Sequence, residues 1–383
     1  MLGLVADDLT GAGDASVQFA KRGWVTFLSL ARLKPGTTDI PPTTDILPTD
    51  VPPAVPDFNR AVIALTTDSR ALSNESAEKL TADAVSALID LGVDRIFLKI
   101  DSTMRGSVRG QIAGALAAWR TRHPDARAFV CPAYPRMGRT VESNRLLVKG
   151  EPVDRTEIGR DPVTPVLTSD MSELLPASEH ITVVDAATDS DLMTIAASIA
   201  VAGPSVVPVG SGGLAEALAA TWSEGRSMKT RPDAAAILGS RKNARILLQV
   251  SSLNPVSLAQ VSRLEVVFPD VVVVSPPAER GDNPAGPQSR TRPTDVAADL
   301  ARRFGEHIER DQWDVLGLVG GDGARETLRQ LGASGIRIVD SLLEGIPLGV
   351  IAGGRADGMP VFTKAGGFGA EDALVRSVER IKA

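Results

Sequence analysis

Short apolar runs alternate with helix-forming segments along this chain, and this alternation restricts the possible folds more than any other feature. Residues 2–6, 61–65 and 95–100 are three such runs. A continuous apolar run of this length is typical of a strand that is covered on both faces, as in a parallel sheet. Strands that alternate with helices predict an α/β protein, in which mostly parallel sheets are flanked by helices.

The alternation occurs twice, once on each side of a segment without clear periodicity. Residues 223–243 mix charge, glycine and proline, which is typical of a connection between domains. The length of 383 residues is also large for a single hydrophobic core. We therefore predict two domains, at residues 1–222 and 244–383, joined by a linker at 223–243, with the active site in the cleft between them.

Three other segments lack a helical or strand pattern. Residues 35–57 and 276–293 are rich in proline, which regular helices and interior strands exclude, and we expect both to be exposed loops. Residues 141–165 are polar and irregular, and we expect them to form a lid or an edge hairpin.

Polar side chains follow the strands expected in the N-terminal domain. Because the carboxyl ends of parallel strands meet at one edge of a sheet, where open α/β sheets bind ligands, we expect these side chains to lie close together. The set consists of Asp7, Asp8, Arg70, Lys99, Asp101, Ser102, Arg105 and Arg139. Arginine binds carboxylates in a bidentate manner, and aspartate accepts hydrogen bonds from sugar hydroxyls. The set therefore favours a small polyhydroxylated acid as ligand.

The first of these strand ends can also be explained without a ligand. Asp8 or Thr10 can cap the helix that follows the first strand, and the glycines nearby allow a tight turn. Taken alone, residues 7–14 fit a capped turn as well as a binding turn. Several charged strand ends at one edge of a sheet favour the binding interpretation.

Glycine-rich segments hold the corresponding position in the C-terminal domain. Residues 320–323 and 366–369 each follow an expected strand and precede an expected helix. Such turns bind phosphate through backbone N–H groups and the helix dipole. The residues expected at this phosphate site are Ser251, Gly320, Gly321, Asp322, Gly323, Gly366 and Gly367. Neither segment is a Walker A loop, because no Gly-Lys-Ser/Thr follows at the required spacing.

Composition argues against several classes of protein. A net charge of −6 disfavours a general nucleic-acid or membrane surface. A single cysteine excludes a disulfide framework and a cysteine-based zinc site, and three scattered histidines argue against a histidine-rich metal site. We see no signal peptide and no apolar stretch long enough for a membrane span, and therefore expect a cytoplasmic protein.

A sugar-acid half joined to a phosphate-binding half is the layout of a small-molecule kinase. Phosphoryl transfer needs in-line positioning, a divalent cation such as Mg²⁺, and a group that orients or deprotonates the acceptor hydroxyl. The carboxylates Asp7, Asp8 and Asp101 are the candidates for that last role.

Six segments also occur together in one known family. They are residues 6–12, 99–106, 132–140, 210–214, 320–323 and 364–369. In this order they resemble the four-carbon acid sugar kinase family, and the resemblance extends from residue 4 to residue 374. It implies a sugar-acid domain followed by a nucleotide domain, and transfer of phosphate from ATP to the terminal hydroxyl of threonate, erythronate or 3-oxo-tetronate.

The resemblance also implies roles for individual residues. By motif, the substrate contacts are Asp7, Arg70, Lys99, Asp101 and Ser102, and the ATP contacts are Ser251, Gly320 to Gly323 and Gly366. Our hypothesis is that Asp7 or Asp101 orients and deprotonates the acceptor hydroxyl. Arg70 and Lys99 would then hold the anionic or polar groups of the substrate, and the glycine N–H groups would hold the phosphates of ATP with Mg²⁺.

Two alternatives remain at this point. Relatives usually carry Asn and Glu where this chain has Ser107 and Gln111, and Ser where it has Ala365, so a binding protein that has lost phosphoryl transfer is possible. An NAD(P)-dependent oxidoreductase acting on a sugar acid is disfavoured, because the chain lacks a Gly-x-Gly-x-x-Gly fingerprint with a well-placed acidic partner. The sequence leaves the stereoisomer of the substrate and the oligomeric state open, with a homodimer as the common default.

Overall fold

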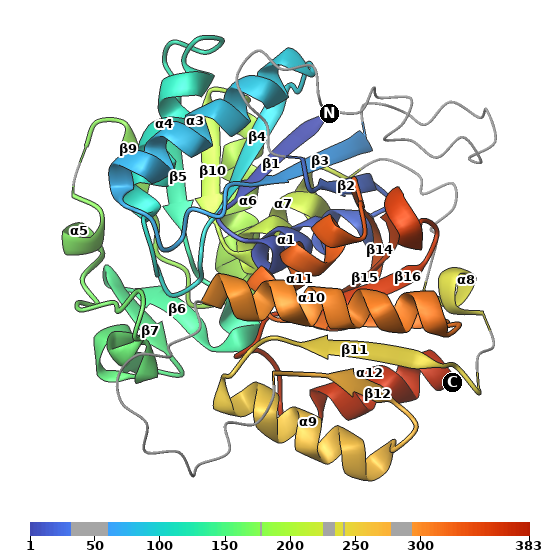
Figure 1. Ribbon diagram of the computed structural model, residues 1–383. Helices are drawn as coiled ribbons and strands as arrows, with labels where there is room; N and C mark the ends of the chain where they lie inside the picture. Colours follow the sequence, from blue (N-terminus) through green and yellow to red (C-terminus); the bar gives the residue numbers. More distant parts are fainter. Residues whose placement is uncertain (32–59, 177, 225–233, 240–241, 277–292) are drawn as a thin grey trace. The chain divides into compact units, whose positions relative to one another are not determined.

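The computed structural model describes residues 1–31, 60–176, 178–224, 234–239, 242–276 and 293–383 (Figure 1). The loop expected at residues 35–57 lies outside this range, as does nearly all of the loop expected at 276–293. The chain divides into two compact units, Met1–Arg231 and Pro232–Ala383. A short helix, α8 (Ala234–Leu238), lies in the segment that the sequence analysis assigns to a linker, whereas residues 225–233 and 240–241 of that segment are not described.

The first unit contains a parallel sheet. Its strands are β1 (Leu2–Ala6), β2 (Val25–Ser29), β3 (Ala61–Thr66), β4 (Arg95–Lys99), β5 (Arg127–Cys131), β9 (Ile181–Val183) and β10 (Val206–Gly210). They lie in the order β2-β3-β1-β4-β10-β5-β9, and every neighbouring pair is parallel. Strand β1 is buried along its whole length, as a central strand between two helical layers must be.

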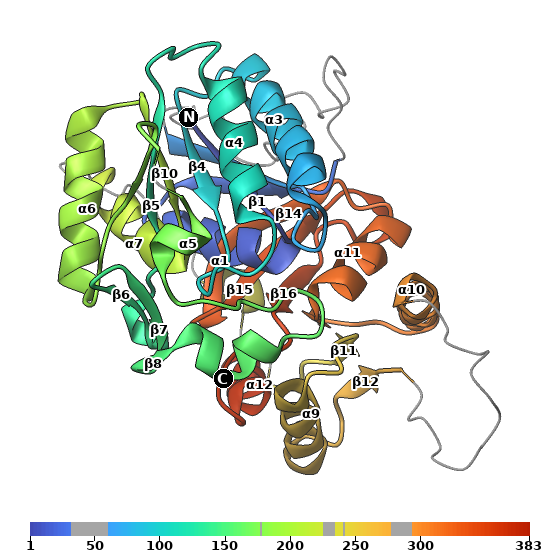
Figure 2. The ribbon, with the colours of Figure 1, turned by 90° about the vertical axis from the view of Figure 1, so that its left-hand side faces the viewer.

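Helices cover both faces of this sheet (Figures 1 and 2). On one face lie α1 (Leu9–Ala20), α6 (Asp189–Ala202) and α7 (Gly212–Thr221), and on the other lie α3 (Asn74–Asp90) and α4 (Val108–Trp119). Side chains cap two of these helices at their first turn, and one of them, Asp8, is a cap that the sequence predicts. The side chain of Asp8 accepts a hydrogen bond from Gly11 N at 2.5 Å, and Ser73 accepts one from Ser76 N at 3.2 Å. Each satisfies a backbone donor that would otherwise lack a partner at the start of a helix.

Residues 139–174 form a small layer of their own. Strands β6 (Arg139–Glu142), β7 (Arg145–Val148) and β8 (Glu151–Pro152) make an antiparallel sheet, followed by the 3₁₀ turns η3 (Val153–Arg155) and η4 (Glu157–Arg160) and by α5 (Met171–Leu174). The segment is therefore a separate three-stranded sheet rather than a hairpin on the edge of the main one. Its first turn places Ser143 and Asn144 at φ of 50° and 60°, which matches the twist of a two-residue hairpin.

The second unit contains a mixed sheet. Strands β11 (Ile246–Val250), β12 (Val272–Val274), β13 (Val315–Val319) and β16 (Pro360–Lys364) are parallel to their neighbours in the order β12-β11-β13-β16. Next to β16 lie β15 (Ile346–Ala352) and then β14 (Gly335–Leu343), and both of these pairings are antiparallel. The expected mostly parallel sheet is confirmed by the first four strands. The sequence analysis predicts neither β14 nor β15, the two strands that add antiparallel pairings to it.

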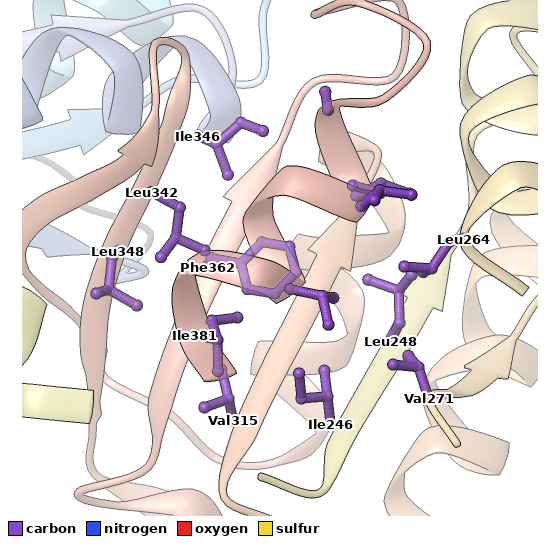
Figure 3. Close-up of a cluster of buried hydrophobic side chains, with 14 of the residues drawn as sticks. Ile246, Leu248, Leu264, Val271, Val315, Leu342, Ile346, Leu348, Phe362 and Ile381 are labelled. Carbon is purple, nitrogen blue, oxygen red and sulfur yellow. The ribbon is translucent and has the colours of Figure 1, made fainter. Parts of the chain in front are cut away.

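The core of the second unit lies between its sheet and two helices, α9 (Pro255–Val267) and α12 (Ala373–Lys382) (Figure 3). Phe362 from β16 packs with Leu264 from α9 and with Leu374, Val378 and Ile381 from α12. The spacing of four and three residues places the α12 side chains on one face of the helix. Burial of each such side chain contributes about 1.5–3 kcal/mol, which fixes both helices on the sheet. Helices α10 (Pro293–Arg310) and α11 (Gly321–Gln330) pack with each other.

The helices in the described part of the chain were compared with the length and hydropathy that a membrane span needs. None of them combines sufficient length with a sufficiently apolar composition to cross a bilayer.

Candidate active site

Three adjacent strands of the first unit deliver charged residues to one edge of the sheet. Asp7 and Asp8 follow β1, Arg70 lies in the turn after β3, and Lys99 and Asp101 lie at the end of β4. Strand β1 leads into α1 on one face, and β4 leads into α4 on the other (Figure 2). Open α/β sheets bind ligands where the connections diverge in this way. The structure therefore brings these predicted residues together.

Arg70 forms the centre of the charged cluster. Its Nε and Nη2 donate to Oδ2 and Oδ1 of Asp7 at 2.7 and 2.9 Å, and its Nη1 lies 2.8 Å from Oδ2 of Asp8. The same nitrogen is 3.9 Å from Oδ2 of Asp101. A bidentate pair of this kind fixes the relative orientation of the two side chains and also stabilises their contact. The guanidinium of Arg70 is therefore already engaged by carboxylates of the protein.

A second pair holds Asp101 in place. Arg105 donates from Nη2 to Oδ2 of Asp101 at 2.9 Å and from Nε to Oδ1 at 3.2 Å. Its Nη1 reaches Oδ2 of Asp161, beyond η4, at 3.3 Å. Asp101 also accepts hydrogen bonds from the backbone N and the hydroxyl of Thr103. Arg105 thus connects the strand-end site to the small antiparallel layer.

The three carboxylates of the cluster differ in their ionisation. Asp7 is 1% exposed, and this burial raises its pKa above the ordinary value despite the opposing charge of Arg70. Burial also acts on Asp101, but Arg105 and Arg70 outweigh it and hold the pKa of Asp101 well below its ordinary value. Burial is likewise outweighed at Asp8, where Arg70 and Lys99 hold the pKa below its ordinary value. Asp7 is consequently the best proton acceptor of the three.

Two cations of the site lack a carboxylate partner within the described residues. Lys99 is buried and donates from Nζ to the carbonyl of Ile100 at 2.9 Å. Arg139 donates from Nη1 to the carbonyl of Met137, and its Nε is buried without any hydrogen-bond partner. Burial lowers the pKa of Arg139 although the more distant charge of Asp101 opposes it, and the nearby charge of Arg105 acts in the same direction as burial. These two groups are suited to an anionic ligand, because a buried cation needs a counter-charge.

Backbone strain fixes the turns that carry the arginines. Asp68 and Met104 adopt φ of 51° and 61°, backbone conformations that residues other than glycine rarely adopt. Gly106 has a φ of 88°, and a Cβ there would lie 2.5 Å from the carbonyl oxygen of Arg70. Glycine is therefore required at this position by both its conformation and its packing. Ser102, the remaining predicted residue, lies half-buried in the same turn.

The predicted glycine segments meet at the carboxyl ends of three adjacent strands of the second unit. Ser251 follows β11, Gly320 follows β13, and Lys364 ends β16. Gly320 N donates to the carbonyl of Lys364 at 2.9 Å, and Ser251 Oγ donates to the carbonyl of Val319 at 3.1 Å. Here too the connections diverge, since β11 leads to one face and β13 to the other.

The start of α11 is open to an anion. Gly320 is the N-cap residue, with a φ of 100°, and no side chain caps the helix. Gly321, Asp322 and Gly323 form its first turn, where backbone N–H groups have no partner within the helix. Such N–H groups and the positive end of the helix dipole bind phosphate.

Side chains of α9 hold the second glycine segment in place by donating hydrogen bonds to its carbonyl groups. Ser257 Oγ donates to the carbonyl of Gly366 at 2.6 Å, and Gln260 Nε2 donates to the carbonyls of Phe368 and Ala370 at 3.1 and 2.7 Å. A Cβ on Gly366 would overlap the hydroxyl of Ser252. Within the described residues, Gly366 N and Gly367 N donate to no other group of the protein.

The site includes residues that sequence reasoning missed. Asp161 lies in a segment without periodicity. Ser257 and Gln260 lie on one face of a helix, and Lys364 lies at the end of a strand, and polar residues are common at both kinds of position. The position of Lys364 two residues before the glycine pair 366–367 is a signal that could have found it.

The donor chemistry of the second unit is compatible with Mg²⁺. The described residues contain no group of three or more carboxylate, histidine or cysteine side chains that could hold a metal ion by themselves. Magnesium in phosphoryl-transfer sites is bound by one or two carboxylates together with phosphate oxygens and water. Asp322, exposed in the first turn of α11, supplies a carboxylate beside the N–H groups that would hold the phosphates.

Together, these two arrangements are suited to a two-domain protein with an anion-accepting charged site in one unit and a phosphate-accepting glycine site in the other. Comparison with known families agrees with this class. A model described as a sugar-binding N-terminal domain matches residues 2–180, and one described as a nucleotide-binding C-terminal domain matches residues 270–374. The chain belongs to the four-carbon acid sugar kinase family.

Named relatives extend along the whole chain. A D-threonate kinase from Bordetella bronchiseptica is 37% identical over 421 residues, covering 100% of this chain and 97% of that protein. A D-erythronate kinase from Heliobacterium modesticaldum is 28% identical, covering 98% of this chain and 96% of that protein. A crystal structure from Bordetella bronchiseptica, described as a domain-swapped dimer with bound citrate, is 32% identical with a TM-score of 0.50, covering 100% of this chain and 98% of that chain.

Proposed function

We propose that this protein is an ATP-dependent kinase that phosphorylates a hydroxyl of a four-carbon acid sugar, with D-threonate as the first candidate. The observation that carries the proposal is the similarity to a D-threonate kinase over the full length of the chain. The charged strand ends of the first unit and the glycine turns of the second support it. Fold alone would not establish the activity.

Lys99 and Arg139 bind the carboxylate of the substrate in this proposal. They are the two cations of the site that form no direct ion pair with a carboxylate of the described residues. Arg70, to which the sequence analysis gives this role, is instead engaged by Asp7 and Asp8. We therefore assign to Arg70 the task of orienting Asp7.

Asp7 accepts the proton of the acceptor hydroxyl, and Asp101 orients the substrate through hydrogen bonds. The raised pKa of Asp7 brings its basicity closer to what a general base needs. The pKa of Asp101, held well below its ordinary value, makes that carboxylate a weak base but a permanent acceptor for hydroxyl groups. Asp8 and Ser102 complete the polar lining.

The second unit binds ATP. The N–H groups of Gly321, Gly323 and their neighbours contact the phosphates, Ser251 lies beside them, and Asp322 would hold Mg²⁺ together with phosphate oxygens. When bound, the cation would neutralise charge that develops on the transferred phosphate. The residues of this chain supply binding and orientation, which are the main contributions of a protein to phosphoryl transfer.

An assay of ADP release tests the proposal. The full-length protein is supplied with ATP, Mg²⁺ and, in separate reactions, D- and L-threonate, D- and L-erythronate and 3-oxo-tetronates. We expect one strong response, to D-threonate. A strong response to another member keeps the activity and changes the substrate. If ATP binds and no member of the panel releases ADP, the protein is a binding protein that has lost phosphoryl transfer.

We further propose a homodimer in the cytoplasm, where ATP and sugar acids are both available. The dimeric crystal structure of the related Bordetella bronchiseptica chain supports the assembly. Light scattering coupled to size-exclusion chromatography should return twice the mass of one chain, and the mass of a single chain would contradict it.

A further inference from the structure

Lys364 carries a buried positive charge for which the described residues supply no counter-ion. It is the last residue of β16, and its side chain is fully buried. Its Nζ donates to the carbonyls of Ala365 at 2.8 Å and Gly366 at 3.1 Å, and no carboxylate in the described ranges contacts it. Because an unpaired ammonium is costly to bury, the structure keeps this charge at a free-energy cost.

The two carbonyl contacts of Lys364 determine which way the neighbouring N–H groups face. In a trans peptide the N–H points opposite to the C=O of the same unit, and the described residues contain no cis bond. The peptides that place their oxygens on Nζ are those whose nitrogens belong to Gly366 and Gly367. These two N–H groups therefore point away from the ammonium, and Gly367 is exposed.

Consecutive N–H groups that face outward form an anion-binding concavity. A cation on the carbonyl side of the same peptides polarises them and strengthens the N–H groups as donors. Lys364 is thus placed behind the concavity, where it both shapes the glycine turn and supplies positive charge.

We propose that Lys364 is a positioning residue for the nucleotide, whose phosphates bind to the N–H groups of Gly366 and Gly367 and serve as the counter-charge of its ammonium. The inference rests on the proposed function, since it names a further residue of the same nucleotide site. It also predicts that phosphate binding is coupled to a proton.

The coupling follows from the state of the lysine before the nucleotide binds. Burial lowers the pKa of Lys364 to about 8, so the free protein loses this proton as the pH rises through that value. A phosphate nearby favours the charged form and raises the pKa again. Between the two pKa values, binding takes up a proton, and the Kd increases by about tenfold per pH unit.

Calorimetric titration of the full-length protein with Mg²⁺-ADP at about pH 8 measures this proton directly, because the observed heat depends on the ionisation heat of the buffer. The phosphates of ADP have already lost their protons at this pH, since phosphate monoesters titrate near about pH 6. We expect uptake of about half a proton per ADP, since the free lysine is half-protonated there. Adenosine, which lacks phosphate, should bind without proton uptake.

Variants assign the proton to its residue. Lys364→Met should abolish the uptake and raise the Kd for ADP at about pH 7 by about tenfold or more, because a charge and two hydrogen bonds are lost. Lys364→Arg should bind ADP without proton uptake, since arginine stays charged. Lys242→Met, at an exposed lysine of the same unit, is the matched control and should behave as wild type.

Two results separate this inference from the proposed function. ADP binding by the wild type without proton uptake, or uptake that persists in Lys364→Met, overturns the role of Lys364 and leaves the kinase proposal intact. Absence of ADP binding by the folded wild type at every pH overturns both. The proton uptake measured on the wild type tests the role of Lys364 even where a variant fails to fold.

Discussion

Arg70 donates two hydrogen bonds to Asp7, from Nε to Oδ2 at 2.7 Å and from Nη2 to Oδ1 at 2.9 Å. The pair connects the turn after β3 to the turn after β1, at the centre of the charged site. It holds a buried carboxylate in one orientation while burial raises the pKa of that carboxylate. An oriented carboxylate of raised basicity is what a proton acceptor in phosphoryl transfer requires.

The first prediction concerns Asp7 as the proton acceptor. Asp7→Asn should lower kcat by about 10²–10⁴-fold, the usual contribution of a general base, while binding of ADP stays unchanged. Steady-state kinetics and calorimetry measure the two effects. Asp125→Asn, at an exposed position of the same unit, is the control. Full turnover by Asp7→Asn would show that the proton goes elsewhere.

The second prediction concerns the substrate carboxylate. Arg139→Gln should raise the KM for the acid sugar by about 10–100-fold, because hydrogen bonds to charged groups contribute about 1.5–3 kcal/mol. The KM for ATP should not change. Arg136→Gln is the matched control, since that guanidinium already pairs with Asp189 and Glu216 at the surface. An equal rise in KM for both variants would contradict a specific role for Arg139.

The sequence predicts much of this site because its residues stand directly after strands. Asp7, Arg70 and Asp101 are separated by many residues in the chain, yet the rule that parallel strands end at one edge places them together. Asp161 follows no such rule, because it reaches Arg105 from an irregular segment whose path only the tertiary structure defines.

The sequence does not predict strands β14 and β15, for a different reason. Both are buried on most of their length, so neither shows the alternation of apolar and polar residues that marks a half-exposed antiparallel strand. Their turn contains a single glycine, Gly345, with a φ of 68°, which is a weak signal without the alternation around it.

The third prediction concerns the pH dependence of stability. The pKa of Asp101 lies well below the value of 3.8 expected in an unfolded chain, so the folded state binds fewer protons than the unfolded state at acidic pH. Asp101 therefore stabilises the protein above the unfolded pKa, and this contribution is lost as the pH falls toward the folded pKa.

Urea unfolding at about pH 5 and about pH 3 measures this loss. Asp101→Asn should show a smaller decrease in the free energy of unfolding between the two conditions than the wild type. The exposed variant Asp125→Asn should retain the full decrease. The same decrease in wild type and Asp101→Asn would mean that the carboxylate is not held ionised in the folded state.

The fourth prediction separates backbone strain from packing at Gly106. Gly106→Ala meets both a positive φ and the carbonyl of Arg70, whereas Gly92, with a φ of 80°, has nothing within 4 Å of an added Cβ. We expect Gly92→Ala to cost about 1–2 kcal/mol of stability from the left-handed conformation alone. Gly106→Ala should cost more, and should also lower kcat/KM, because Arg70 must move. Thermal unfolding and kinetics test both, and equal effects in the two variants would contradict the packing argument.

Phosphorus NMR of a mixture of the protein, ATP, Mg²⁺ and D-threonate tests the central claim most directly. The account predicts a new phosphomonoester signal that grows in equal amount with ADP, and that grows at least about 10²-fold more slowly when Asp7→Asn replaces the wild type. Formation of inorganic phosphate and ADP without a phosphomonoester, for D-threonate and for each of the other four-carbon acids, would contradict it.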